Sequence, residues 1–275
     1  MFNLNCNGRL LIIDTPIVMG VINITSDSFY PGSRHQTERD ILVTAEKMLE
    51  EGATLLDIGG QSTKPGSRQL SAEEELERVV PAITSILKRF PDAFVSVDTW
   101  YARVAKTTVA AGACMINDIS AGNMDTSLLD VIATLNVPYV LMHMQGTPTT
   151  MQQQPFYKDV TREVLDFFIE KIGLLRNKGL KDIIIDPGYG FGKTIEHNFT
   201  LLKNQSVFEM LDVPVLIGVS RKSMIYKTLD TDSTQALNGT TVLHTIGLLN
   251  GASILRVHDV KEAAQTIKLI KNVFG

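Results

Sequence analysis

The side chains best able to do chemistry stand directly after short apolar runs in this chain. Asp98, Asn117 and Asp186 each end such a run and supply carboxylate or amide groups. Groups of this kind bind a metal ion, act as general bases, or accept paired N–H donors from a heterocycle. The residue types alone leave these three uses open, but together they predict a polar site at the ends of strands.

Basic residues gather after the last two apolar runs. Ser220-Arg221-Lys222-Ser223 follows one run, and the other ends at Arg256 and His258, alternate positions whose side chains point to the same side of a strand. Guanidinium, imidazole and helix-terminal N–H groups all donate hydrogen bonds to anions. These residues therefore predict a site for an anionic group such as phosphate or diphosphate, unless the bases pair with Asp57 or Asp259 instead.

A glycine-rich segment, Asp-Pro-Gly-Tyr-Gly-Phe-Gly-Lys over residues 186–193, follows a further apolar run. Glycines at alternate positions permit a close turn of the backbone at a site. The spacing fits neither the phosphate-binding P-loop nor the dinucleotide fingerprint. We therefore interpret the segment either as part of the site or as a tight turn capped by its own Asp186.

Two other kinds of site receive little support from the sequence. No group of His, Asp and Glu has the spacing of metal ligands, and His35, His197 and His244 fall on predicted loops or helices, where solvent or packing accounts for them. His143 ends an apolar run, so both a structural and a catalytic role remain open. Neither a Ser–His–Asp set nor an activated cysteine is identifiable, which favours binding and electrostatics over covalent catalysis.

The elements that must position these side chains alternate along the chain. About eight apolar runs recur, as expected of buried parallel strands, whose C-terminal ends carry the chemistry in a (β/α)8 barrel. Amphipathic patterns separate them, so we predict an α/β fold, a (β/α)8 TIM barrel, with a doubly wound open sheet as the alternative. The runs end at Asn23, Asp57, Asp98, Asn117, His143, Asp186, Ser220 and Arg256, and helices are expected at about 101–111, 125–135, 159–178, 195–211, 234–249 and 260–273.

The N-terminal segment carries a hairpin signal. Asn7-Gly8 between two apolar stretches predicts a β-hairpin within residues 1–15 that closes the N-terminal mouth of the barrel. The barrel then spans residues 16–275, and because no shift in composition marks a boundary, we expect residues 1–275 to form a single domain.

Local signals also mark helices and loops. Ser71 and Glu74 have the spacing of a capping box, and Pro81 should kink or restart the helix behind it, because its ring displaces a backbone hydrogen bond. The connections at about 24–36, 59–70 and 144–157 are long and irregular, which is typical of binding loops. All three would lie on the catalytic face of the barrel.

Composition excludes several classes of protein. The net charge of −4 and a sequence pI of about 5.8 argue against a sequence-independent nucleic-acid binder. The only cysteines, Cys6 and Cys114, are too few for a disulfide framework and fit a reducing cytoplasm. A secretory leader and a membrane-spanning run are both absent from the sequence pattern, so we expect neither secretion nor membrane insertion.

Several motifs in order along the chain closely resemble those of bacterial dihydropteroate synthase, a pterin-binding barrel family. They are residues 19–29 (Met-Gly-Val-Ile-Asn-Ile-Thr-Ser-Asp-Ser-Phe), 57–66 (Asp-Ile-Gly-Gly-Gln-Ser-Thr-Lys-Pro-Gly), 116–118, 143–148, 186–193, 220–223 and 256–258. The resemblance implies condensation of p-aminobenzoate with 6-hydroxymethyl-7,8-dihydropterin diphosphate in folate biosynthesis. Diphosphate would be released with the help of Mg²⁺, and sulfonamides would block the reaction. No protein nucleophile is required.

Carried over by position, the resemblance assigns residues to three subsites. The pterin ring would meet Asp98, Asn117, Asp186 and Lys222, with Met142 and Phe191 as apolar walls. The diphosphate would meet Asn23, Thr63, Lys64, Arg256 and His258, with Asn23 near Mg²⁺ as its metal ligand. The p-aminobenzoate carboxylate would lie near Ser223, covered by Phe29 and Pro65. The catalytic set would be Asp98, Asp186, Lys222, Arg256 and His258.

The chain departs from the usual family pattern in two loops. Gln61 and Lys64 stand where Glu and Arg are common, and Pro31 stands where an acidic residue is often found. Lys64 keeps the positive charge but lacks the planar fork of arginine, so its contact with diphosphate would be looser. Two alternatives remain, a corrinoid-dependent pterin methyltransferase and a catalytically silent pterin-binding paralogue. The resemblance also implies a homodimer formed through outer helices.

Overall fold

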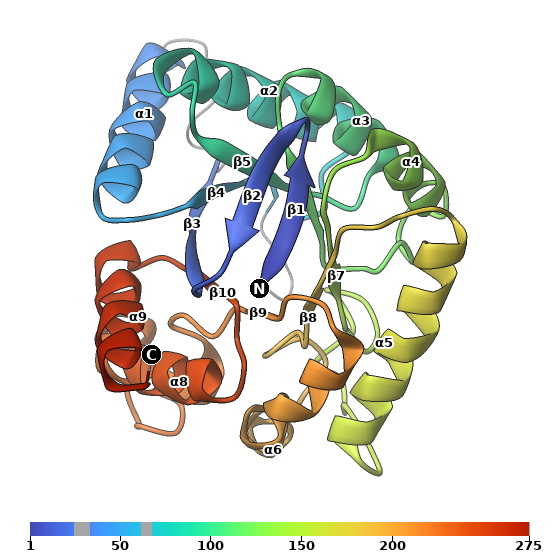
Figure 1. Cartoon of the computed structure of the whole chain (residues 1–275), viewed down its shortest axis with the longest axis vertical. Helices are drawn as coiled ribbons and strands as arrows, with labels where there is room; N and C mark the ends of the chain where they lie inside the picture. The colour runs from blue at the N-terminus through green and yellow to red at the C-terminus, as the bar shows by residue number, and fades with distance from the viewer. Residues whose placement is uncertain (25–33, 62–67, 275) are drawn as a thin grey trace.

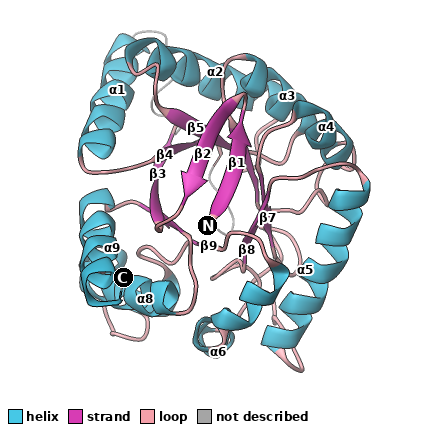
Figure 2. Cartoon of the chain, in the orientation of Figure 1, coloured by secondary structure: helices cyan, strands magenta, loops and turns pink. Residues whose placement is uncertain are grey.

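The computed structural model describes residues 1–24, 34–61 and 68–274, without the side chains of residues 34–37. Strands occupy the centre of the molecule and helices surround them (Figures 1 and 2). The elements are β1 (Phe2–Cys6), β2 (Arg9–Ile13), β3 (Ile17–Asn23), α1 (Arg34–Glu50), β4 (Leu55–Gly59), α2 (Ala72–Arg89), β5 (Phe94–Asp98), α3 (Ala102–Ala110), β6 (Met115–Asp118), α4 (Leu128–Leu135), β7 (Tyr139–Met142), α5 (Val160–Asn177), β8 (Ile183–Asp186), α6 (Ile195–Lys203), η2 (Gln205–Leu211), β9 (Leu216–Ile217), α7 (Ser223–Tyr226), η3 (Ser233–Gln235), α8 (Leu237–Leu249), β10 (Ile254–Val257) and α9 (Val260–Phe274).

Eight parallel strands form the barrel. Their order is β8-β7-β6-β5-β4-β3-β10-β9, so each strand pairs with its neighbours in sequence and β10 returns to β3. Ile185 forms a parallel bridge with Val215, and its N–H donates to the carbonyl of Pro214 at 3.0 Å, which joins β8 to the segment entering β9. The predicted barrel is confirmed, and the open-sheet alternative is wrong because the two edge strands meet.

The pleat of the strands separates two apolar layers. Leu56, Ile58 and Val97 belong to the cluster between strands and helices, whereas Met19 and Leu55 belong to the cluster inside the barrel. Because successive side chains alternate between the two faces of a strand, the residue after an outward-facing one points inward. This alternation directs the polar residues at the strand ends, Asp57, Asp98, Asn117, Asp186 and Arg256, into the barrel mouth.

The N-terminal hairpin closes the other end of the barrel. β1 and β2 pair antiparallel around Asn7 and Gly8, both of which have positive φ angles of 54° and 82° as a tight hairpin turn requires. One face of the hairpin contributes Leu4, Cys6, Leu11 and Ile13 to the same apolar cluster as the barrel interior. Figure 1 shows the hairpin lying across the barrel opening, so the predicted plug is confirmed.

Most predicted helices are present, with two corrections. The helix expected at 195–211 is divided, because α6 ends at Lys203 and a 3-10 segment follows; the buried side chain of Gln205 donates to the carbonyl of Gly247 and accepts from Tyr189. The segment expected at 234–249 likewise begins with a separate 3-10 turn, η3.

Two local predictions concern helix α2, its capping box and the effect of Pro81. Its capping box at Ser71 and Glu74 is confirmed, with both reciprocal hydrogen bonds present. The helix is continuous from Ala72 to Arg89 through Pro81, so the predicted restart at this proline is wrong. No helix among the described residues has the length and apolar character needed to cross a membrane.

Candidate active site

Strand register places several predicted residues at one level of the barrel mouth. Asn23 pairs with Gly59, Gly59 with Asp98, and Asp98 with Asn117, so the ends of β3 to β6 form a single row. A Cβ atom on Gly59 would lie 3.1 Å from Oδ1 of Asn23. The glycine therefore leaves room for the amide beside it. On the next two strands, Met142 at the end of β7 pairs with Asp186 at the end of β8.

Arg256 bridges two carboxylates at the centre of this mouth. Its Nε donates to Oδ2 of Asp57 and its Nη2 donates to Oδ2 of Asp98, each at 2.7 Å. Nδ2 of Asn117 donates to the same oxygen of Asp57 at 3.0 Å, whereas Oδ1 of Asp57 is buried with no hydrogen-bond partner in the described structure. The expectation that Arg256 could pair with Asp57 is confirmed, and the acceptors and the cation form one connected cluster.

Burial sets the protonation of this cluster. Burial raises the pKa of Asp98 to about 7, against the opposing effect of Arg256. Burial lowers the pKa of Arg256, but the charges of Asp57 and Asp98 outweigh it and the net shift is upward. The guanidinium is therefore a permanent cation, while Asp98 can change its protonation near neutral pH.

A second group of predicted residues surrounds the glycine-rich turn after β8. Oδ1 of Asp186 accepts from the N–H of Gly188 at 2.8 Å, so this carboxylate both caps the turn and faces the mouth. Nζ of Lys222 donates to the carbonyl of Tyr189 at 2.5 Å and lies 4.6 Å from the ring centroid of Phe191. Burial lowers the pKa of Lys222 to about 8 and raises that of Asp186, and each residue opposes the shift of the other.

An apolar wall completes this side of the mouth. Met142, Trp100 and Ile119 are buried together, and Phe191 packs against them with its side chain partly exposed. Met142 and Phe191 were predicted; Trp100 was missed, although it is the only tryptophan of the chain and follows Asp98 by two positions. Its Nε1 is buried without a hydrogen-bond partner among the described residues.

Lys193 is a further buried charge that the sequence interpretation left without a role. Its Nζ donates to the carbonyls of Gly188 and Phe191 at 3.0 and 3.1 Å and contacts the side chain of His143. A Cβ atom on Gly188 would lie 1.9 Å from the carbonyl oxygen of His143, so only glycine allows this close approach. A lysine at the end of a glycine-rich turn was the available signal.

The remaining predicted residues lie around the rim. Asn23 and His258 are exposed, and Ser223 is half-buried as the first residue of α7. The backbone N–H of His258 donates to Oγ of Ser220 at 3.3 Å, and its Nδ1 lies 3.3 Å from the same oxygen. Arg221, by contrast, forms an ion pair with Asp259.

Some predictions fall on parts of the chain that the structure does not describe. Thr63, Lys64, Phe29, Pro31 and Pro65 all lie outside the described residues. Two histidines that were assigned to packing or solvent have local roles: Nδ1 of His197 accepts from the N–H of Thr194 at the start of α6, and His244 is buried in α8. The side chain of His35 is outside the described set.

One barrel mouth brings together hydrogen-bond acceptors, a fixed cation and an apolar wall. This combination is typical of an enzyme that binds a heterocyclic substrate. The family model for pterin binding enzymes matches residues 19–258. Dihydropteroate synthase of Escherichia coli K12 is 40% identical over 96% of this chain and 94% of its own length.

Solved structures agree with this assignment. Yersinia pestis dihydropteroate synthase, in a sulfonamide drug complex, matches with a TM-score of 0.92 and 39% identity over 99% of each chain. Xanthomonas albilineans dihydropteroate synthase with 4-aminobenzoic acid matches with a TM-score of 0.91 and 40% identity over 98% of this chain and 97% of that one. The chain belongs to the pterin-binding enzyme family and, within it, to the dihydropteroate synthases.

Proposed function

We propose that this protein condenses 6-hydroxymethyl-7,8-dihydropterin diphosphate with p-aminobenzoate, forming 7,8-dihydropteroate and releasing diphosphate in folate biosynthesis. The observation that carries the proposal is the cluster in which Arg256 bridges Asp57 and Asp98. This cluster places a permanent cation beside carboxylates that can accept hydrogen bonds from the ring. Relatives of this chain are named dihydropteroate synthase. The solved relative that holds 4-aminobenzoic acid supports the second substrate.

The pterin ring is held, in this proposal, by the acceptors on the barrel floor. The ring N–H and amino groups donate to Asp98 and Asp186, Asn117 supplies an amide, and Lys222 donates to an acceptor atom of the ring. Met142 and Phe191 lie in one apolar cluster and pack against the ring face. Buried carboxylates make strong hydrogen bonds to N–H donors because few other partners compete for them.

The diphosphate is placed toward Arg256 and His258. Breaking the C–O bond sends its electron pair onto the departing diphosphate, and the amine nitrogen of p-aminobenzoate forms the new C–N bond and loses a proton to solvent. Positive charge develops on the pterin methylene, which Asp98 and Asp186 stabilise, while Arg256 and His258 stabilise the leaving group. We also assign Thr63 and Lys64 to the diphosphate, on the strength of the motif alone.

We propose that a magnesium ion enters the mouth with the diphosphate of the substrate. Among the described residues no three His, Cys, Asp or Glu side chains group as metal ligands, and Asn23 presents an exposed amide at the end of β3. Mg²⁺ commonly takes few protein ligands and keeps waters and phosphate oxygens. We propose that Asn23 and the diphosphate hold it, and that it neutralises charge on the leaving group. An Asn23→Ala variant should then need more Mg²⁺ for half-maximal turnover.

Ser223 is our proposed contact for the carboxylate of p-aminobenzoate. It is the first residue of α7 and directly follows Lys222, which we assign to the pterin ring. Phe29 and Pro65 would cover this substrate from the two loops outside the described residues.

We further propose a homodimer formed through outer helices. Val242, Ile246 and Leu249 are exposed along one face of α8, and Leu269 and Val273 are exposed on its neighbour α9. Exposed apolar groups of this kind commonly mark an interface between subunits. Ile246→Glu should convert a dimer to a monomer in sedimentation analysis, and a wild-type protein that sediments as a monomer would contradict the proposal.

The function is tested by incubating the purified protein with the dihydropterin diphosphate, p-aminobenzoate and Mg²⁺. We expect equal amounts of 7,8-dihydropteroate and diphosphate, both abolished by Asp186→Asn. Binding of the pterin substrate without turnover would identify the silent paralogue instead. Methyl transfer from a methylated pterin to a corrinoid, with no diphosphate release, would identify the methyltransferase.

A further inference from the structure

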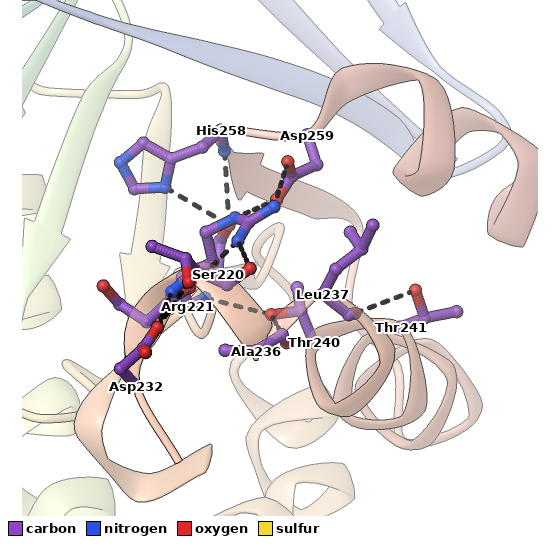
Figure 3. Close-up of polar contacts among 11 residues, drawn as sticks. Ser220, Arg221, Asp232, Ala236, Leu237, Thr240, Thr241, His258 and Asp259 are labelled. Carbon is purple, nitrogen blue, oxygen red and sulfur yellow. Dashed lines mark hydrogen bonds and ion pairs between the residues drawn. The ribbon is translucent and has the colours of Figure 1, made fainter. Parts of the chain in front are cut away.

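The segments that follow the neighbouring strands β9 and β10 are joined by two consecutive side-chain contacts. Ser220 contacts the backbone and ring of His258, and one residue later Arg221 pairs with Asp259 (Figure 3). Nε and Nη2 of Arg221 donate to Oδ2 and Oδ1 of Asp259 at 2.8 and 2.9 Å. Such a two-point pair fixes orientation as well as distance.

Arg221 is itself held in an unusual backbone conformation. Its φ angle is 52°, in the left-handed region that residues with a Cβ atom rarely adopt. Its N–H donates to Oγ1 of Thr240 at 3.0 Å, and its Nη1 donates to the carbonyls of Ser233 and Thr234 at 2.9 and 2.8 Å. Unfavourable backbone geometry persists where surrounding contacts enforce it and is concentrated at functional sites.

The pair also stands directly beside two residues of the proposed site. Lys222 follows Arg221 and contacts the turn that carries Phe191, whereas His258 precedes Asp259 and is the residue we assign to the diphosphate. The ion pair joins the segment after β9 to the segment after β10. It therefore constrains the spacing between Lys222 and His258, which the proposed function assigns to the ring and to the diphosphate.

We propose that Arg221 and Asp259 are positioning residues, and that their paired contact aligns the pterin ring subsite with the diphosphate subsite. This inference rests on the proposed function for its substrates. Neither side chain needs to touch a substrate. Loss of the pair should leave each subsite able to bind its own ligand but should disturb the alignment that the reaction requires.

The first test separates turnover from binding. Asp259→Asn removes the charge and Arg221→Lys keeps the charge but removes the fork. Each should lower kcat for condensation by about 10- to 100-fold, while the Kd values for inorganic diphosphate and for 6-hydroxymethylpterin stay within about 3-fold of wild type. Because both changes break one contact, the double variant should lose no more than about the larger single loss.

The second test does not depend on turnover. Calorimetric titration with inorganic diphosphate, with and without bound 6-hydroxymethylpterin, measures how strongly the two subsites are coupled. We expect the pterin to change diphosphate affinity in the wild type, and this coupling to disappear in Asp259→Asn and Arg221→Lys. Asp130→Asn, which breaks an exposed ion pair with Lys178, is the matched control and should retain both turnover and coupling.

Several outcomes would overturn the inference. One is kcat within about 2-fold of wild type in both variants, together with unchanged coupling. Another is a parallel loss of kcat, both single-ligand affinities and thermal stability, since that would show a merely structural role. Wild-type turnover and coupling in Arg221→Lys would show that the positive charge is sufficient and that the two-point contact is not needed. By contrast, if the wild type makes no dihydropteroate but its coupling is lost in both variants, the proposed function is refuted and the positioning role is supported.

Discussion

Nζ of Lys193 lies 2.9 Å from Nδ1 of His143, and both side chains are buried. The lysine also donates to the carbonyl oxygens of Gly188 and Phe191 within the turn that follows Asp186. Burial, followed by the charge of Lys193, lowers the pKa of His143 well below its usual value. The imidazole is therefore neutral at neutral pH, and the single buried amino group of Lys193 ties the end of β7 to the turn after β8.

Lys193→Met should destabilise the protein by about 1–3 kcal/mol, because it leaves buried carbonyl oxygens without a donor. Urea unfolding at several pH values measures the change. Burial lowers the pKa of Lys193 to about 7 in the folded protein. Between about pH 7 and the ordinary pKa of lysine, the unfolded wild type therefore binds more protons than the folded wild type. Wild-type stability should therefore rise relative to Lys193→Met as pH increases from 7 to about 10. An equal stability gap at every pH would contradict this, and Lys181→Met at an exposed lysine should change little.

Asp57→Asn tests the orientation of Arg256. The buried oxygen Oδ2 of Asp57 accepts from both Arg256 and Asn117, so loss of its charge weakens two contacts at once. We expect kcat/KM for the pterin diphosphate to fall by about 10- to 100-fold, as measured by steady-state kinetics. Asp166→Asn, in an exposed pair with Arg162, is the control that should leave kinetics intact. A loss below about 3-fold in Asp57→Asn would remove Asp57 from the site.

Asp98→Asn tests the ionisation of the ring site. Burial raises the pKa of Asp98 to about 7, so in the free protein the carboxylate form grows as pH rises through neutrality. The carboxylate is the better acceptor for ring N–H groups, and kcat/KM for the pterin substrate should therefore rise between about pH 6 and 8. The asparagine variant should be less active and should lack this rise. If the rise persists unchanged in the variant, another group is responsible for it.

Leu11→Ala tests the hairpin as a plug of the barrel. Leu11 is 4% exposed inside the barrel opening, whereas the adjacent Leu10 is 63% exposed on the other face of β2. Removing the buried side chain should cost about 2–4 kcal/mol of unfolding free energy, and Leu10→Ala should stay within about 0.5 kcal/mol of wild type. Chemical denaturation of the two variants compares them directly. Similar losses in both would show that the hairpin does not pack as described.

The fold was largely predictable because the sequence pattern is continuous and local. Apolar runs ending on Asp98, Asn117 and Asp186 required only the alternation of side chains along a strand to place these residues in one mouth. The hairpin prediction depended on Asn7-Gly8, a dipeptide that is strongly preferred in two-residue hairpin turns. Helix interruptions were not predictable, since the break near Gln205 depends on partners from α8 and its C-terminal end, far along the chain.

The pattern of the sequence predicts which site residues stand at the strand ends, but it does not predict which of them contact one another. Asp57 was one possible partner of Arg256 from residue type, but nothing in the spacing showed that Arg256 would also reach Asp98, because these residues meet only when β10 returns to β3. Lys193 and Trp100 were missed because their roles depend on burial, and single lysines and tryptophans carry no periodic signal. Arg221 was grouped with the anion-binding residues, with Asp259 as an alternative partner, and the alternative is confirmed because its guanidinium pairs with Asp259.

The division of the mouth into a ring subsite and a diphosphate subsite is tested most directly by His258→Ala. His258 is exposed at the rim, whereas Arg256 contacts the ring acceptor Asp98 and would affect both ligands when changed. Calorimetry should compare 6-hydroxymethyl-7,8-dihydropterin with its diphosphate on wild type and variant. We expect the diphosphate ligand to bind about 10-fold or more weakly and the plain pterin to stay within about 2-fold. Equal losses for the two ligands would contradict the division.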